Sequence, residues 1–225
     1  VPPGFCVTTE AYDRALRATG FSPAERWSAA LHSSGPERQK ILSWCRTTIQ
    51  NADIAELTAQ IVERVRLLDP PLRRLWAVRS SATNEDGASA SFAGIYLTRL
   101  GIPLEEIGLA MKDLWLSMWD ERVLNYHATS GLSDAPAMAV LLQPMLEAQA
   151  AGVAYSIHPI TGRATQVVID AVAGLAAALV EGRATPDQYV VEIDEQGQPI
   201  LICDRRITGQ THALRMTEQG LRDVP

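Results

Sequence analysis

The sequence predicts an α+β protein in which helices come first and antiparallel strands follow. Apolar residues recur every three or four positions through residues 36–68 and again from Pro103 to His127, which is the spacing of helices packed on a core. After Pro136, short apolar runs alternate with turn residues, a pattern typical of strands. Because short connections join these strands, we expect them to pair in antiparallel sheets with the helices flanking them.

The first 72 residues are expected to be mostly helical. Thr8 or Thr9 is a candidate N-cap for a helix from Glu10 to Thr19. Ser22-Pro-Ala-Glu25 repeats this start signal, because it offers a capping serine, a proline at the first helical position and then an acidic residue.

Three side chains of the predicted helices receive specific interpretations. Trp27 and Trp44 are expected in the core, since tryptophan in a helical apolar pattern more often packs than binds a ligand. Lys112 is one of only two lysines in the chain, and we expect it to be a solvated helix residue.

Glycine and proline divide the strand region after Pro136. Pro144 marks the end of the first strand, because proline cannot donate to a sheet. Gly174 to Gly182 is expected to form a short helix, and Asp194-Glu-Gln-Gly197 is a hairpin turn signal. The predicted strands are Pro136–Leu146, Gly152–Ile157, Gln166–Ala171, Gln188–Ile193 and Pro199–Ile202.

A polar loop between two strands stands out in the middle of the chain. Strands are expected over Leu75–Val78 and Ile95–Leu100, and the residues between them are mostly small, polar or glycine. A loop of this kind on a rigid scaffold is a common place for binding residues.

The residues of this loop predict an anion site. Arg79, Ser80 and Ser81 offer a guanidinium and two hydroxyls, and Gly94 allows backbone N–H groups to approach a polyphosphate. The alternative is a plain hairpin loop in which Arg79 pairs with a carboxylate of the sequence Glu85-Asp86.

Composition limits the classes of partner. The chain has 225 residues and a net charge of −6, which argues against a basic face for nucleic acid. Its longest apolar run, around Val172 to Val180, is too short to span a bilayer.

Cys6, Cys45 and Cys203 are odd in number and widely spaced, which favours reduced thiols in a cytoplasmic protein. The first residue is Val rather than Met, so we expect a piece of a longer protein.

Four motifs occur in a fixed order along the chain. They are Pro2-Pro-Gly-Phe-Cys-Val-Thr-Thr9, Arg79-Ser-Ser-Ala82 with Ser91-Phe-Ala-Gly94, Gln143-Pro-Met-Leu146 with Gly152-Val-Ala-Tyr155, and Thr185-Pro-Asp-Gln-Tyr189. Together they resemble the nucleotide-binding domain of the pyruvate phosphate dikinase and phosphoenolpyruvate synthase family, which includes rifampin phosphotransferases. The resemblance covers the chain from Val1 to about Ile207.

The resemblance implies an ATP-grasp fold, with mixed or antiparallel sheets and flanking helices, that holds ATP and Mg²⁺ in a cleft between subdomains. Residues 1–74 would form a mostly helical entry subdomain and residues 75–146 a phosphate-loop subdomain that ends at a hinge. Residues 147–225 would form an incomplete second lobe of the ATP cleft.

The resemblance also implies roles for single residues. Arg79 matches the basic residue that contacts the ATP phosphates and is the catalytic candidate, while the segment 80–94, with Ser80, Ser81 and Gly94, resembles a flap over them. The run Gln143, Pro144, Met145 and Leu146 looks like the hinge whose backbone reads the adenine edge, with Met145 and Leu146 as apolar walls.

Members of this family use ATP to phosphorylate a histidine on a separate swivelling domain. That histidine then phosphorylates pyruvate, or an antibiotic hydroxyl in the rifampin enzymes. The resemblance therefore implies a phosphohistidine domain and an acceptor domain as partners, on the same or another chain, with no role for nucleic acid or membrane.

Several family features are not found in this sequence. The Gly-Gly-Lys-Gly element lies upstream of the first motif in the family, outside these residues, and no Asp-x-Glu followed by Gln-x-Arg occurs after Tyr189. Gly174-Leu-Ala-Ala177 stands where the family has Gly-Leu-Gly-Glu. An alternative is therefore a non-catalytic, degenerate module that acts as a regulatory or protein-binding subunit.

Metal ligands and histidines give no further catalytic group. No pair among the acidic residues of the later half forms a recognisable ligand set, so the metal site is unassigned; these residues are Asp170, Glu181, Asp187 and Glu192. His158 is expected to be a structural turn residue. The other three histidines are expected at the surface: His32, His127 and His212.

Overall fold

The computed structural model describes residues 3–68, 75–83, 95–217 and 219–225. They form two compact units, Val1–Met145 and Leu146–Pro225, which we describe separately. The predicted division at residue 74 falls inside the first unit, because residues on both sides of it share one hydrophobic core. None of the helices that the structure describes is long and apolar enough to cross a membrane.

An antiparallel sheet of four strands lies at the centre of the first unit, in the order β1-β4-β2-β3. Its side chains alternate between two environments. In β4, Met138, Val140 and Leu142 are fully buried, whereas the residues between them are partly exposed. The strands are β1 (Phe5–Val7), β2 (Trp76–Ala82), β3 (Thr98–Ile102) and β4 (Met138–Pro144).

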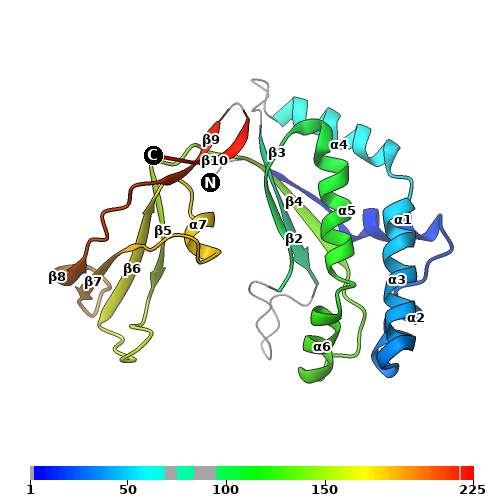
Figure 1. Cartoon of the computed structure of the whole chain (residues 1–225), viewed down its shortest axis with the longest axis horizontal. Helices are drawn as coiled ribbons and strands as arrows, with labels where there is room; N and C mark the ends of the chain where they lie inside the picture. The colour runs from blue at the N-terminus through cyan, green and yellow to red at the C-terminus, as the bar shows by residue number, and fades with distance from the viewer. Residues whose placement is uncertain (1–2, 69–74, 84–94, 218) are drawn as a thin grey trace. The chain divides into compact units, whose positions relative to one another are not determined.

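Helices cover one face of this sheet (Figure 1). Helix α5 packs on β2, β3 and β4, and helix α1 packs on β4. The described helices of this unit are α1 (Thr9–Arg17), α2 (Pro23–His32), α3 (Gly35–Asn51), α4 (Ala55–Leu68), the 3₁₀ turn η1 (Leu104–Glu106), α5 (Ile107–Ser117) and α6 (Glu121–Thr129).

Both long predicted helices are interrupted in the structure. The segment 36–68 breaks at Asp53, whose carboxylate accepts a hydrogen bond from the Ala55 amide at 3.0 Å and so starts α4. The stretch from Pro103 to His127 divides into η1, α5 and α6, with Asp120 as the N-cap of α6. Periodicity detects the apolar stripe but not the turns that let successive helices follow the core.

Two aromatic predictions have opposite outcomes. Trp27 is fully buried, as expected, and its ring meets Trp119 edge to face. Trp44 was expected in the core, but it is 42% exposed. Its ring stacks on Phe21, and the Arg26 guanidinium lies 4.2 Å from the Trp44 ring centroid. Trp44 therefore closes the rim of the core instead of filling it.

His127 was expected at the surface, but it is fully buried. Its Nε2 atom lies 3.2 Å from the Tyr96 hydroxyl, and its ring meets Trp27 edge to face. Burial lowers the pKa of His127 to about 4, so the imidazole is neutral at pH 7. Lys112, expected to be solvated, is partly buried and donates a hydrogen bond to the Gln50 carbonyl at 2.9 Å.

The second unit contains a separate antiparallel sheet, in the order β5-β6-β7-β8, and a hairpin of β9 and β10. The Asp194 turn joins β7 to β8 as predicted, because the Asp194 carboxylate accepts hydrogen bonds from the Gln196 and Gln198 amides. The elements are β5 (Ala150–Tyr155), β6 (Gln166–Ala173), α7 (Ala177–Val180), β7 (Asp187–Ile193), β8 (Pro199–Arg206), β9 (Ala213–Thr217) and β10 (Gly220–Val224).

The structure thus confirms an α+β chain with antiparallel sheets, consistent with an ATP-grasp-like fold. The hairpin of β9 and β10 was missed, because charged residues such as Arg215 and Arg222 interrupt its apolar pattern. The predicted strand ending at Val78 continues to Ala82, and the strand predicted from Ile95 begins at Thr98.

Candidate functional site

One face of the β1-β4-β2-β3 sheet is not covered by the helices of its own unit (Figure 1). Directly opposite residues of antiparallel strands project from the same face, so the register identifies its side chains. One row crosses all four strands and contains Cys6, Leu141, Arg79 and Thr98. Cys6, Arg79 and Thr98 of this row are exposed. We call this surface the open face.

Arg79 projects from the middle of the open face. It was predicted at the start of a loop, but it lies inside β2, where pairing with Leu141 and Thr98 fixes its backbone on both sides. Among the residues that the structure describes, none forms an ion pair or a side-chain hydrogen bond with Arg79. The alternative partners Glu85 and Asp86 lie outside the described residues. A guanidinium held on a rigid strand and open to solvent is suited to bind a phosphate.

The two serines after Arg79 project from opposite faces. Ser81 lies opposite Ala139 and is exposed on the open face, two residues along the strand from Arg79. Ser80 lies opposite the fully buried Val140, so its hydroxyl is on the helix-covered side, away from Arg79. Gly94 lies outside the described residues.

The predicted hinge begins on the same face. Gln143 lies opposite Ala77, so it is a diagonal neighbour of Arg79 at a distance of about 7–8 Å between backbones. Gly4 packs directly beside it. A Cβ atom at Gly4 would lie 2.7 Å from the Leu142 carbonyl oxygen and 2.8 Å from Cγ of Gln143. The glycine of the first motif therefore provides the room in which the Gln143 side chain lies.

The remaining hinge residues differ in their environments. Pro144 ends β4 and is buried. The Met145 amide donates to the Leu75 carbonyl at 3.0 Å, so this N–H group is already used within the unit. The Met145 side chain is 8% exposed. Leu146 is 50% exposed and is the first residue of the second unit.

The acidic residues considered for a metal are each engaged with a neighbour in the second unit. Two hydrogen bonds from Thr208, the stronger from its backbone N–H, hold the pKa of Asp187 below its ordinary value. Asp170 accepts from the side-chain amide of Gln188 at 2.8 Å, Glu181 pairs with Arg183 at 2.7 Å, and Glu192 accepts from the Cys203 thiol at 3.6 Å. Across the described residues, no group of three or more His, Cys, Asp or Glu side chains is placed to hold a metal ion.

The histidine predictions for this unit agree with its geometry. Nδ1 of His158 accepts hydrogen bonds from the Ile160 and Thr161 amides, at 3.2 and 3.4 Å, which makes it a turn residue. His212 is exposed.

Sequence reasoning missed Thr98, Leu141 and Cys6 as neighbours of Arg79. Each belongs to a different strand. They come into one row only because β3 and β4 pair with β2 on its two sides and β1 pairs with β4. The alternation of side chains along a strand could have placed Leu141 with Gln143 on one face, but not beside Arg79.

Comparison with known families gives one match over almost the whole chain. Residues 1–224 match the family described as the pyruvate phosphate dikinase, AMP/ATP-binding domain. The match includes the open face and all but the last residue of the second unit.

Curated relatives are similar over nearly all of this chain. It is 36% identical over 227 aligned residues to a phosphoenolpyruvate synthase of Aeropyrum pernix, covering 95% of this chain and 27% of the relative. It is 32% identical to a rifampicin phosphotransferase of Streptomyces sviceus, covering 100% of this chain and 26% of the relative. It is 33% identical to the prodigiosin synthesizing transferase PigC of Serratia marcescens, covering 98% of this chain and 23% of the relative. The chain thus spans about a quarter of the length of these relatives.

Proposed function

Because the chain belongs to the AMP/ATP-binding domain family of pyruvate phosphate dikinase, we propose that its open face binds ATP and that the whole protein is a phosphotransferase. The observation that carries this proposal is the position of Arg79. An exposed guanidinium lies on a paired strand within two residues of Ser81 and diagonal to Gln143, all on one face.

The open face has a polar side and an apolar side, which suggests how the nucleotide lies on it. Arg79, Ser81 and Thr98 lie on β2 and β3, while Leu141 and the partly buried Ala139 lie on β4. Phosphates would contact Arg79 and Ser81, and the adenosine would lie toward Gln143 and the start of the hinge. Since the Met145 amide is already bonded within the unit, the Leu146 N–H group would be the backbone donor to adenine.

In this proposal the phosphates bring Mg²⁺ with them. When bound, the ion would neutralise phosphate charge during transfer. The described residues supply no set of ligands that would hold it without the nucleotide. The part played by this chain is to bind the phosphates through Arg79, to orient them with Ser81 and to hold the base end near Gln143.

The whole protein would use ATP to phosphorylate a histidine on a separate swivelling domain. That histidine would then phosphorylate pyruvate, as in a phosphoenolpyruvate synthase, or another acceptor. The chain spans only about a quarter of its relatives' length, so the histidine and the acceptor site would belong to other parts of the protein.

Thiol reactivity allows a direct test of where ATP binds. The variant Thr98→Cys, with Cys6 replaced by serine, has an exposed thiol on the open face directly opposite Arg79. Cys203 is exposed on β8 of the second unit, and Cys45 is buried, which raises the pKa of its thiol to about 12. The full-length protein would be alkylated with and without ATP and Mg²⁺, and each cysteine followed by peptide mass spectrometry.

We expect ATP at ten times its Kd to slow the alkylation of the thiol at position 98 about tenfold, since about nine-tenths of the sites are then filled. Cys203 serves as the internal control and should react at the same rate throughout. If calorimetry shows that ATP binds while the thiol at position 98 stays equally reactive, the nucleotide lies elsewhere. If the folded protein binds no ATP, the proposal fails and the non-catalytic alternative is supported.

A further inference from the structure

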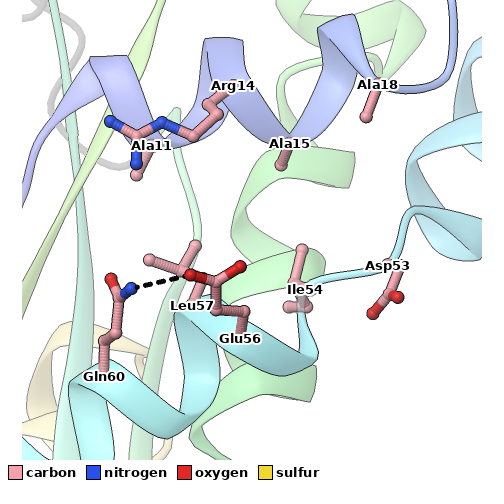
Figure 2. Close-up of a pocket in the computed structure, with 9 residues that line it drawn as sticks. All are labelled: Ala11, Arg14, Ala15, Ala18, Asp53, Ile54, Glu56, Leu57 and Gln60. Atoms are coloured by element: carbon pink, nitrogen blue, oxygen red, sulfur yellow. Dashed lines mark hydrogen bonds between the residues drawn. The ribbon is translucent and has the colours of Figure 1, made fainter.

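A groove runs between α4 and the pair formed by α1 and the edge strand β1 of the first unit. It consists of two adjoining hollows of about 260 and 460 Å³, which share Leu57 and Gln60. Figure 2 shows the first hollow, with Ala11, Ala15 and Ala18 facing α4 across the gap. The groove separates two elements of the same unit, so α4 and α1 do not pack closely along it.

The walls of the groove are largely apolar, and the polar or charged side chains among them are Arg14, Asp53, Glu56, Gln60 and Arg64. On α1, Ala11, Ala15 and Ala18 recur every three or four residues and present one narrow, small-residue wall. On α4, Leu57 is partly buried and Leu67 is 67% exposed, although both line the groove. Leu57 also packs against the core, so Leu67 is the large apolar side chain of α4 that a further element would cover here.

The groove has the length of a helix of several turns. From Leu57 to Leu67 along α4 the distance is about 15 Å, at about 1.5 Å per helical residue. Small residues on α1 let another helix approach closely, since helix axes pack about 8–10 Å apart depending on the side chains between them.

Charged side chains at the two ends of the groove define a direction. Asp53 and Glu56 lie at the end where α4 begins, and they outnumber Arg14 of α1, which lines the same hollow. Arg64 lies toward the end where α4 finishes, so the charge of the lining changes from negative to positive along the groove. Helices commonly carry acidic residues in the first turn and basic residues in the last, because these charges complement the helix dipole. A helix antiparallel to α4 would place its acidic start near Arg64 and its basic end near Asp53 and Glu56.

The source of such a helix is suggested by the comparison with relatives. About three quarters of each curated relative lies outside the part that matches this chain. We propose that the groove is the docking site of an amphipathic helix from another part of the same polypeptide, outside these 225 residues, which lies antiparallel to α4. Alanine, leucine and other apolar residues would form the inner face of this helix.

Two neighbouring residues of α4 provide a matched test in the full-length protein. Gln60 and Ala59 are both exposed in this structure, but Gln60 lines both hollows and Ala59 lines neither. Gln60→Cys and Ala59→Cys would be made with Cys6 and Cys203 replaced by serine, and the rate of maleimide labelling at each position measured. We expect labelling to be about tenfold or more slower for Gln60→Cys, because it requires the docked helix to open. Equal rates would overturn the proposal.

The identity of the occupant is tested by photo-crosslinking from the same position. With a benzophenone amino acid in place of Gln60, the proposal predicts an intramolecular crosslink to a peptide from outside the 225 residues, with an apolar face at helical spacing. A crosslink between two copies of the protein, or one confined to residues 1–225, would contradict it. The same amino acid in place of Ala59 is the control and should capture no such peptide.

Discussion

At the scale of single residues, Arg79 carries the candidate site. Its charge lies on the open face in a row with Thr98 and Leu141, and a phosphate bound there would gain a charge-assisted contact. We expect Arg79→Ala to weaken ATP binding by about 1.5–3 kcal/mol, which is the range for hydrogen bonds to charged groups. Calorimetric titration with ATP and Mg²⁺ measures this change.

The neighbouring strand offers a control for that substitution. Arg99 on β3 lies opposite Val78, on the helix-covered side, and pairs with Asp113 at 2.8 Å. Arg99→Ala removes an equal charge near the same strands, but it should leave ATP affinity almost unchanged. If both variants lose affinity equally, Arg79 acts only through the net charge of the domain.

His127 makes stability depend on pH. Burial lowers its pKa from 6.5 to about 4, so the folded protein binds the proton less well than the unfolded chain. The stabilising effect of the neutral form is complete above pH 6.5 and is lost as the pH falls toward 4. We expect a loss of about 3 kcal/mol in the free energy of unfolding over this window.

The variant His127→Gln isolates this effect, because glutamine can still bond the Tyr96 hydroxyl but does not titrate. Urea unfolding at several pH values would compare it with the parent protein. The difference in unfolding free energy between the two should change from pH 7 to pH 4, whereas a constant difference would show that His127 does not titrate on unfolding.

At the scale of elements, the contact of α5 with α4 depends on one glycine. A Cβ atom at Gly108 would lie 2.6 Å from Oγ1 of Thr58 and 3.2 Å from its Cγ2. Gly108→Ala should therefore push the two helices apart and lower the unfolding free energy by about 1–3 kcal/mol, despite the better helix propensity of alanine. Thermal unfolding with circular dichroism measures the change.

A second substitution should rescue this variant. Thr58→Ala removes both close atoms and leaves a Cβ at 3.5 Å, which is an ordinary contact. The double variant should regain most of the lost stability and could exceed the parent by about 0.5–1 kcal/mol, the advantage of alanine over glycine in a helix. Additive losses in the double variant would mean that the helices do not meet at this point.

Strand pairing also decided the secondary structure of the candidate site. Arg79, Ser80 and Ser81 are too polar to be assigned to a strand from composition, and the sequence placed them in a loop. In the structure they continue β2, since β4 supplies hydrogen-bonding partners up to Ala82. Pairing also separates the two serines, because successive residues of a strand project from opposite faces.

At the scale of the whole molecule, the two units differ in the size of their cores. The principal hydrophobic cluster consists entirely of residues from the first unit. In the second unit, several apolar side chains of β8 are exposed, including Ile200 at 60% and Ile202 at 58%. The buried apolar residues there are Val168, Val172, Ala178, Val190, Ala213 and Leu214. So small a core should provide little stability of its own.

This difference predicts unequal hydrogen exchange in the 225-residue chain. After correction for intrinsic rates, amides in β6 and β7 should exchange at least about tenfold faster than those in β2 and β4, because the second unit opens at lower cost. Exchange followed by mass spectrometry resolves these strands. Equal protection in both sheets would show that the second unit is as stable as the first.

The sequence by itself determined the class of fold, the order of helices and strands, and the ordered motifs of the family. Local signals carry this information: apolar periodicity marks the helices, Pro144 ends a strand, and Asp194-Glu-Gln-Gly197 forms the hairpin turn. Such signals act between residues close in the chain, so they can be read without knowing the fold.

Only the tertiary structure decided which of these residues meet. Arg79 joins Thr98, Leu141 and Cys6 because four strands, with helices between β1 and β2 and between β3 and β4, pair in one register. His127 is buried, although its sequence context resembles a surface position, because α6 turns it toward Trp27 and Tyr96. Contacts between residues far apart in the chain depend on how the elements pack, and that packing minimises the exposed apolar surface of the whole unit rather than of any one segment.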